Sequence, residues 1–133
     1  MRLAIPCLLF VLATVAPCQV VINEICAINN TVLQDADGES SDWIELQNQS
    51  STLMNLANHY LTDDPSNLTK WQFQGSTFIG NMGRLIVFAS GKNRLIGGQR
   101  HASFRLAGGG DYVALVAPDG VTILSEITPT YPQ

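Results

Sequence analysis

Apolar and polar residues alternate with a period of two along much of this chain, in short runs separated by Gly, Asn, Asp and Pro. Such alternation is typical of β-strands that bury one face. From residue 19 onward, no window sustains the period of about 3.6 residues that an amphipathic helix shows. The runs predict strands at Val20–Cys26, Asp42–Asn48, Leu53–Leu56, Tyr60–Thr62, Lys70–Phe73, Leu85–Ala89, Ser103–Leu106, Tyr112–Ala117 and Val121–Ile127.

Three of these runs show how the strands are arranged. Pro118-Asp119-Gly120 joins Tyr112–Ala117 to Val121–Ile127, and this turn chemistry between two alternating runs indicates a β-hairpin. Leu85–Ala89 is apolar on both faces, which is typical of a central strand. Many short strands with frequent turn signals favour an all-β fold, and at this length a two-sheet antiparallel β-sandwich over a barrel.

The alternation also assigns side chains to faces. Ile44 and Leu46 share the face predicted to enter the core, whereas Trp43 and Glu45 share the other face. Trp43 is therefore either exposed or in a second packed layer, and the pattern favours a core tryptophan. An exposed tryptophan on a strand can bind a sugar or a protein, which makes Trp43 the candidate ligand-binding residue. The other side chains predicted to face inward are Val87, Leu115 and Ile123.

The first residues follow a different pattern. Arg2 precedes an apolar stretch over residues 3–15, and the small residues Ala16 and Cys18 follow it. This predicts a secretory signal peptide over residues 1–18, because a membrane span needs about 20 apolar residues. The expected location is secreted, extracytoplasmic or cell surface, with no membrane span after cleavage. Residues 19–128 are expected to form one domain, and residues 129–133 a C-terminal tail, possibly truncated.

Charge and motif content limit the function. The net charge of −4 repels nucleic-acid phosphates, so no nucleic-acid partner is expected. His59 and His101 are the only histidines, and neither belongs to a motif for nucleophilic catalysis. A hydrolase that uses Glu24, Asp42 or Glu45 is the enzymatic alternative. We therefore expect no enzyme, no catalytic residue and no bound cofactor.

One acidic segment is similar to calcium-binding loops. Asp35, Asp37 and Glu39 alternate with small residues, and carboxylate oxygens are the ligands that calcium prefers. However, Leu33 stands where that motif needs its first aspartate, and Ile44 where it needs its last glutamate. The sequence favours an acidic solvated turn, and these three carboxylates remain the candidates for a weak Ca²⁺ site.

Segments spread over Val20–Ile127 share their order and spacing with a known family. They are Ile22-Asn23-Glu24-Ile25, Asp35-Ala36-Asp37-Gly38, Asp42-Trp43-Ile44-Glu45-Leu46-Gln47-Asn48, Asn55-Leu56, Tyr60-Leu61-Thr62-Asp63-Asp64, Trp71-Gln72-Phe73, Leu85-Ile86-Val87-Phe88-Ala89 and the hairpin at Asp119-Gly120. In these segments the chain resembles the lamin tail domain, a family of immunoglobulin-like β-sandwiches. With a leader and no long heptad rod, it is similar to the bacterial exported branch. At Asn58-His59 the family often has Gly-Trp instead.

The resemblance implies a binding function and no catalysed reaction. It implies a non-catalytic, exported interaction or attachment module, whose partner is a protein or a cell-surface polymer. In the exported branch, the domain often precedes much longer sequences, including spore coat protein H-like kinases. The alternative is therefore an accessory domain of a larger secreted or surface enzyme whose catalytic part is absent from this chain.

Overall fold

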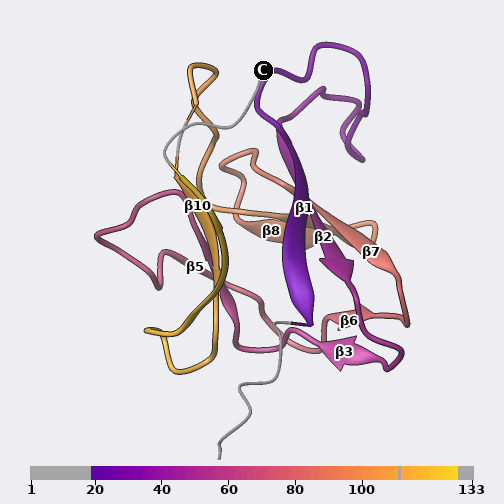
Figure 1. The fold of residues 1–133 in the computed structure, drawn as a ribbon. Coiled ribbons are helices and arrows are strands. Elements are labelled where there is room, and N and C mark those ends of the chain that lie inside the picture. The colour runs from indigo at the N-terminus through magenta and orange to yellow at the C-terminus, as the bar shows by residue number, and fades with distance from the viewer. Residues whose placement is uncertain (1–18, 111, 129–133) are drawn as a thin grey trace, which may run out of the picture.

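The computed structural model describes residues 19–110 and 112–128, and the predicted signal peptide and tail lie outside them. The described residues form strands and no helix (Figure 1). Accordingly, no helix in this part of the chain could cross a membrane. The strands are β1 (Val20–Cys26), β2 (Trp43–Asn48), β3 (Met54–Asn55), β4 (Tyr60–Thr62), β5 (Trp71–Gln72), β6 (Phe78–Ile79), β7 (Arg84–Phe88), β8 (Arg94–Ile96), β9 (Gln99–His101), β10 (Val113–Val116) and β11 (Ile123–Ile127).

Two larger sheets form a sandwich, as predicted. The five-stranded sheet has the order β1-β2-β7-β9-β8, and the four-stranded sheet has the order β11-β10-β4-β5. All pairs are antiparallel except β7 with β9, which run parallel. A third, two-stranded sheet of β3 and β6 lies at one end of the sandwich (Figure 1). Strand β7 is central in its sheet, as its apolar sequence indicated.

The core lies between the two sheets and follows the predicted alternation. Ile44, Leu46 and Val87 are 0% exposed on the inner face of the five-stranded sheet, opposite Leu61 and Leu115. Fully burying such a side chain contributes about 1.5–3 kcal/mol. This apolar layer fixes the register of the strands, because a one-residue slip would move every buried side chain to the other face.

Ile123 departs from the prediction, since it is 40% exposed. The register between β10 and β11 shifts at this point: Val116 pairs with Ile123, whereas Leu115 pairs with Ser125. Leu124 is the extra residue of this β-bulge, and it packs against the core in place of Ile123. The predicted hairpin itself is confirmed, with Gly120 in its turn at a φ of 74°.

The predicted strand at Ser103–Leu106 is wrong. In this segment Arg105 forms an isolated bridge with Ser90. The pairing that continues β9 ends just before it, at Ala102, whose N–H donates to Phe88 O and whose carbonyl accepts from the Asn93 N–H. The sequence analysis also missed β6 and the hairpin of β8 and β9. That hairpin turns at Gly97-Gly98, whose φ angles of 57° and 78° are the left-handed values that two-residue hairpins need.

Candidate functional site

The acidic loop between β1 and β2 is organised around Asp35. This side chain is fully buried and accepts hydrogen bonds from the backbone N–H groups of Asp37 and Glu39, each at 3.0 Å. It also accepts one from the Ser41 hydroxyl at 3.1 Å. The loop is therefore a turn closed by its own carboxylate, which is how aspartate commonly stabilises irregular backbone.

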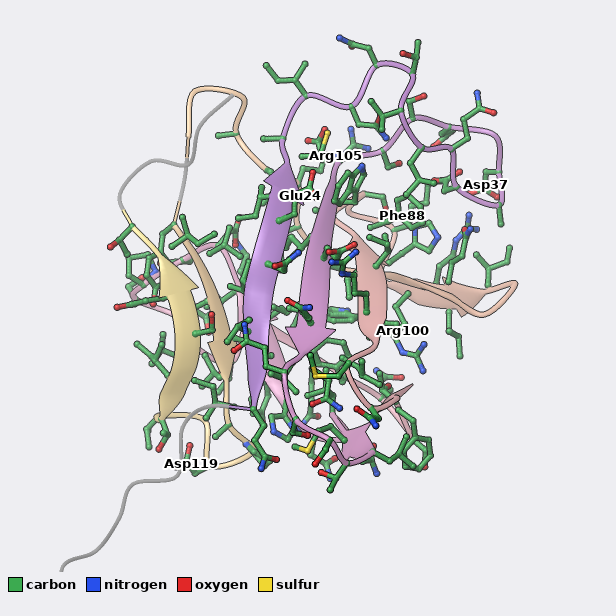
Figure 2. The ribbon with its side chains drawn as sticks, turned by 45° about the vertical axis from the view of Figure 1, so that its right-hand side comes forward. Glu24, Asp37, Phe88, Arg100, Arg105 and Asp119 are labelled. Carbon is green, nitrogen blue, oxygen red and sulfur yellow. The ribbon has the colours of Figure 1, made fainter. Side chains whose placement is uncertain are left out.

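Lys92 joins this turn to the five-stranded sheet. Its Nζ lies 2.6 Å from Asp35 Oδ2, 2.5 Å from Asp37 Oδ2 and 2.8 Å from Glu39 Oε2. Arg94 also pairs with Asp37, and Figure 2 shows Asp37 on the loop that projects beside these strands. The three predicted carboxylates do come together, with ligand atoms within 4.8 Å of one another. We call Asp35, Asp37, Glu39 and Lys92 the loop clamp.

The electrostatics of the loop clamp follow from this geometry. Burial on its own would raise the pKa of Asp35, but hydrogen bonds from Lys92, Glu39 and Asp37 outweigh it and lower that pKa to about 2. Burial would likewise lower the pKa of Lys92, yet its hydrogen bonds to the carboxylates raise it. Both groups are therefore charged at neutral pH.

Lys92 supplies the positive charge that a calcium ion would supply. Calcium takes 6–8 oxygen ligands, and it would have to displace an ammonium group that already contacts all three carboxylates. The residues present fit an internal ion cluster better than a metal site. Calcium binding at Asp35, Asp37 and Glu39 stays a prediction.

Trp43 lies in a second packed layer on the outer face of the five-stranded sheet. It is 7% exposed and is aligned across the strands with Phe88 and His101. The rings of Phe88 and His101 are stacked, with centroids 5.3 Å apart. Trp43 thus offers no open ring face to a ligand, and its Nε1 has no hydrogen-bond partner among the described residues.

The structure pairs Ser90 with His101, which the sequence analysis missed. Ser90 Oγ lies 2.9 Å from His101 Nδ1, and both side chains are buried. Since Ser90 Oγ also accepts the backbone N–H of Lys92, its own proton is free for His101. Burial lowers the pKa of His101, which keeps the ring neutral. No described carboxylate orients the ring, because His101 Nε2 has no partner in this part of the chain. This pair therefore stabilises the layer around Phe88 and does not form a catalytic triad.

A hollow of about 220 Å³ lies next to Ser90. Its lining is polar and includes Asp42, whose pKa is raised by burial. Glu24 and Glu45, the other acids considered for hydrolysis, lie on β1 and β2, and neither lines this hollow. Glu24 and Glu45 are instead directly opposite each other across β1 and β2, so two of the three candidate carboxylates are neighbours, outside this hollow.

A second hollow lies at the side of the sandwich where the sheets diverge. The opposite side is closed, because β1 and β11 pack together and the Ile22 N–H donates to Ser125 Oγ at 3.0 Å. At the open side, the edge strands are β5 and β8. Between them is a pocket of about 110 Å³, which we call the open-edge pocket. It is lined by Trp71, Gln72, Gln74, Asn93, Arg94, Leu95 and Arg100.

Trp71 and Asn93 are two lining residues of the open-edge pocket that bond to each other. The Trp71 Nε1–H donates to Asn93 Oδ1 at 3.1 Å, and this bond links the two sheets at their diverging edges. Trp71 is only 8% exposed and packs edge-on against Phe73, with ring centroids 4.8 Å apart. Core packing therefore holds Trp71 in place, and the hydrogen bond ties Asn93 to it.

Comparison with known proteins agrees with the fold and the motifs. The Lamin Tail Domain family profile matches residues 14–129. The chain belongs to the lamin tail domain family. No curated protein matches its sequence closely enough to count as a relative. As a lamin tail domain, it is an immunoglobulin-like β-sandwich of a non-catalytic interaction family.

One departure from the lamin tail pattern has a structural reason. Asn58 stands where the family often has Gly, and its φ of 65° is left-handed. Asn is the residue that tolerates this conformation best after Gly. The turn before β4 is therefore preserved: the Asn58 N–H donates to Phe73 O, and His59 beside it is half-buried.

Proposed function

We propose that this lamin tail domain is an exported attachment module that binds a protein or a cell-surface polymer through its open edge. The observation that carries the proposal is the open-edge pocket, which combines apolar and polar side chains between two edge strands. Interaction sites are typically concave and combine apolar area with a few placed polar groups. The module serves this role alone or attached to a secreted enzyme.

The leader pattern of residues 1–18 supports the export that this proposal includes. We expect protein recovered from the culture medium to have an intact mass that corresponds to an N-terminus near Gln19. Recovery only of chain starting at Met1, in the cytosol, would contradict export.

Binding is tested with secreted protein, labelled with a fluorophore and incubated with cells of the source organism. Gln74→Trp should fill the open-edge pocket and abolish retention on the cells, because Gln74 is exposed and lines it. Gln49→Trp is the matched control, since Gln49 is exposed and is not part of the pocket lining. Retention no greater than that of the label alone would refute the attachment role. Equal retention of both variants would refute the open edge as the binding surface.

A further inference from the structure

The open-edge pocket has two arginines in its lining, of which Arg94 pairs with Asp37 and Arg100 forms no ion pair with the described residues. Arg100 lies on β9, opposite Val87 of β7 and Leu95 of β8, and so belongs to the inner face of the sheet where the sandwich opens. Its Nε donates to Thr77 Oγ1 at 2.9 Å, and its Nη2 donates to Ser76 O at 3.3 Å. Figure 2 shows its side chain at this edge, pointing away from the ribbon. The guanidinium is thus held in place by two neutral acceptors.

The charge of Arg100 has no counter-charge in the part of the chain that the structure describes. Ion pairs join other basic side chains to carboxylates here: Lys70 to Asp63, Arg84 to Glu45, Lys92 to the loop clamp and Arg94 to Asp37. Arg100 is half-buried and forms none. Burial lowers its pKa, which reflects the cost of shielding the charge from water. A partly buried, unpaired charge is unfavourable unless an anion binds it.

We propose that the open-edge pocket binds the carboxylate of an acidic side chain in an extended polypeptide, with Arg100 as its partner. This inference rests on the proposed function and names the ligand chemistry. A guanidinium has five N–H donors, and the bonds to Thr77 and Ser76 use two of them. The remaining donors are at Nη1 and Nη2, which form the parallel fork that matches the two oxygens of a carboxylate.

The rest of the pocket suits the stem of an acidic side chain. Leu95 is 63% exposed and lies across from Arg100, so its side chain can contact the methylene groups next to the carboxylate. The amide groups of Gln74 and Asn93 line the same hollow and can bind polar atoms of a backbone. The pocket is a partly open hollow of about 110 Å³, which can receive one side chain.

The edge strands favour a polypeptide over a polysaccharide. Among residues 19–110 and 112–128, β5 pairs only with β4 and β8 only with β9, so each is an edge strand with one side of its backbone unpaired by this part of the chain. An extended peptide can hydrogen-bond to such an edge. Sugars in contrast commonly stack on an open aromatic face, and Trp71 is 8% exposed.

The test uses the secreted protein and two blocked pentapeptides of valine and threonine, one with a central glutamate and the other with a central glutamine. Titrations followed by NMR at the Arg100 Nε–H and Trp71 Nε1–H should give a dissociation constant at least tenfold lower for the glutamate peptide. This ratio corresponds to about 1.4 kcal/mol and lies at the lower limit for a hydrogen-bonded charge pair. In Arg100→Gln the two peptides should bind with equal dissociation constants. Arg84→Gln should retain the tenfold difference, because Arg84 is exposed, pairs with Glu45 and does not line the pocket.

A second variant keeps the inference testable if Arg100→Gln fails to fold. Leu95→Glu places a carboxylate across from Arg100 at an exposed position, and it should compete with the glutamate peptide and abolish the ratio. Equal affinity for the two peptides, or an unchanged ratio in both variants, would overturn the inference. Tighter binding of inorganic phosphate or of oligogalacturonate at Arg100 would also overturn it, in favour of another anion. If Gln74→Trp still abolishes retention on cells, the proposed function survives that result.

Discussion

The loop clamp makes a sharp prediction for Lys92→Met, which keeps the length of the side chain and removes its charge. A hydrogen bond to a charged group contributes about 1.5–3 kcal/mol. The contacts with Asp37 and Glu39 contribute little of this, because these side chains are 31% and 63% exposed. The contact with Asp35 dominates, since its side chain is 0% exposed. We expect the free energy of unfolding of Lys92→Met to be lower by about 2–3 kcal/mol at pH 7, and its melting temperature to be lower by ~10 °C.

Acid should reduce the difference in free energy of unfolding between the natural protein and Lys92→Met. The pKa of Asp35 is about 2 in the folded protein, below its ordinary value of 3.8. Its ionised form therefore stabilises the fold above the ordinary pKa, and this contribution is lost as the pH falls through about 2. Without Lys92, the N–H groups of Asp37 and Glu39 and the Ser41 hydroxyl still oppose burial, but the largest of the stabilising hydrogen bonds is lost, so the contribution of Asp35 is smaller wherever it is ionised. Urea unfolding from pH 7 to pH 2 should show the free energies of unfolding converging.

Calcium adds a second readout to the same experiment. In the natural protein Lys92 contacts all three carboxylates, so about 10 mM calcium should leave the melting temperature unchanged. In Lys92→Met the carboxylates lose their internal cation, and calcium should restore part of the stability. Arg84→Met is the control, with an expected change within about 0.5 kcal/mol, because Arg84 is 60% exposed. An equally small change in Lys92→Met, or micromolar calcium affinity of the natural protein, would refute the reasoning.

Three further predictions concern the fold and the absence of catalysis. Leu46→Ala should cost about 2–5 kcal/mol in denaturant unfolding, whereas Glu45→Ala should change stability by about 0.5 kcal/mol. Similar losses would mean that the packed layer on the outer face of β2 extends from Trp43 to Glu45. Asn48→Ala should cost about 2–4 kcal/mol, because its buried amide donates to Thr52 O, Ile79 O and Gly80 O, and a loss below 1 kcal/mol in the same assay would show that water replaces these bonds. The purified protein should be inert towards esters, peptides, glycosides and phosphodiesters. Turnover that Ser90→Ala abolishes would show that the Ser90–His101 pair is catalytic.

The sequence predicted those parts of the fold in which local pattern and burial agree. Strands β1, β2, β4, β7 and β10 each alternate or are wholly apolar, because each has a face in the core. Strands β8 and β9 have only three residues each, which is too few for an alternation to be recognised. Their only local signal is Gly97-Gly98. The bulge at Leu124 depends on pairing with β10, so alternation along β11 alone misplaces Ile123.

The candidate site was less predictable, because its contacts cross the fold. Asp35, Asp37 and Glu39 are close in sequence, but the lysine that binds them is 57 residues away from Asp35. A separate loop brings it there, and no spacing rule connects the two. The burial of Trp43 also depends on a distant partner, Phe88 on β7. The open-edge pocket has residues from both sheets. That Arg100 forms no ion pair with any described residue can be recognised only after the partners of the other basic residues are known.

The closed side of the sandwich has a mechanical consequence. Strands β1 and β11 lie side by side and run in the same direction, so the chain enters at one end of the sandwich and leaves at the other (Figure 1). Tension applied to residues 19 and 128 would pull these strands past one another and load their contacts all at once. If the proposed attachment role holds, the domain would resist tension through the contacts between β1 and β11, which would be loaded in shear.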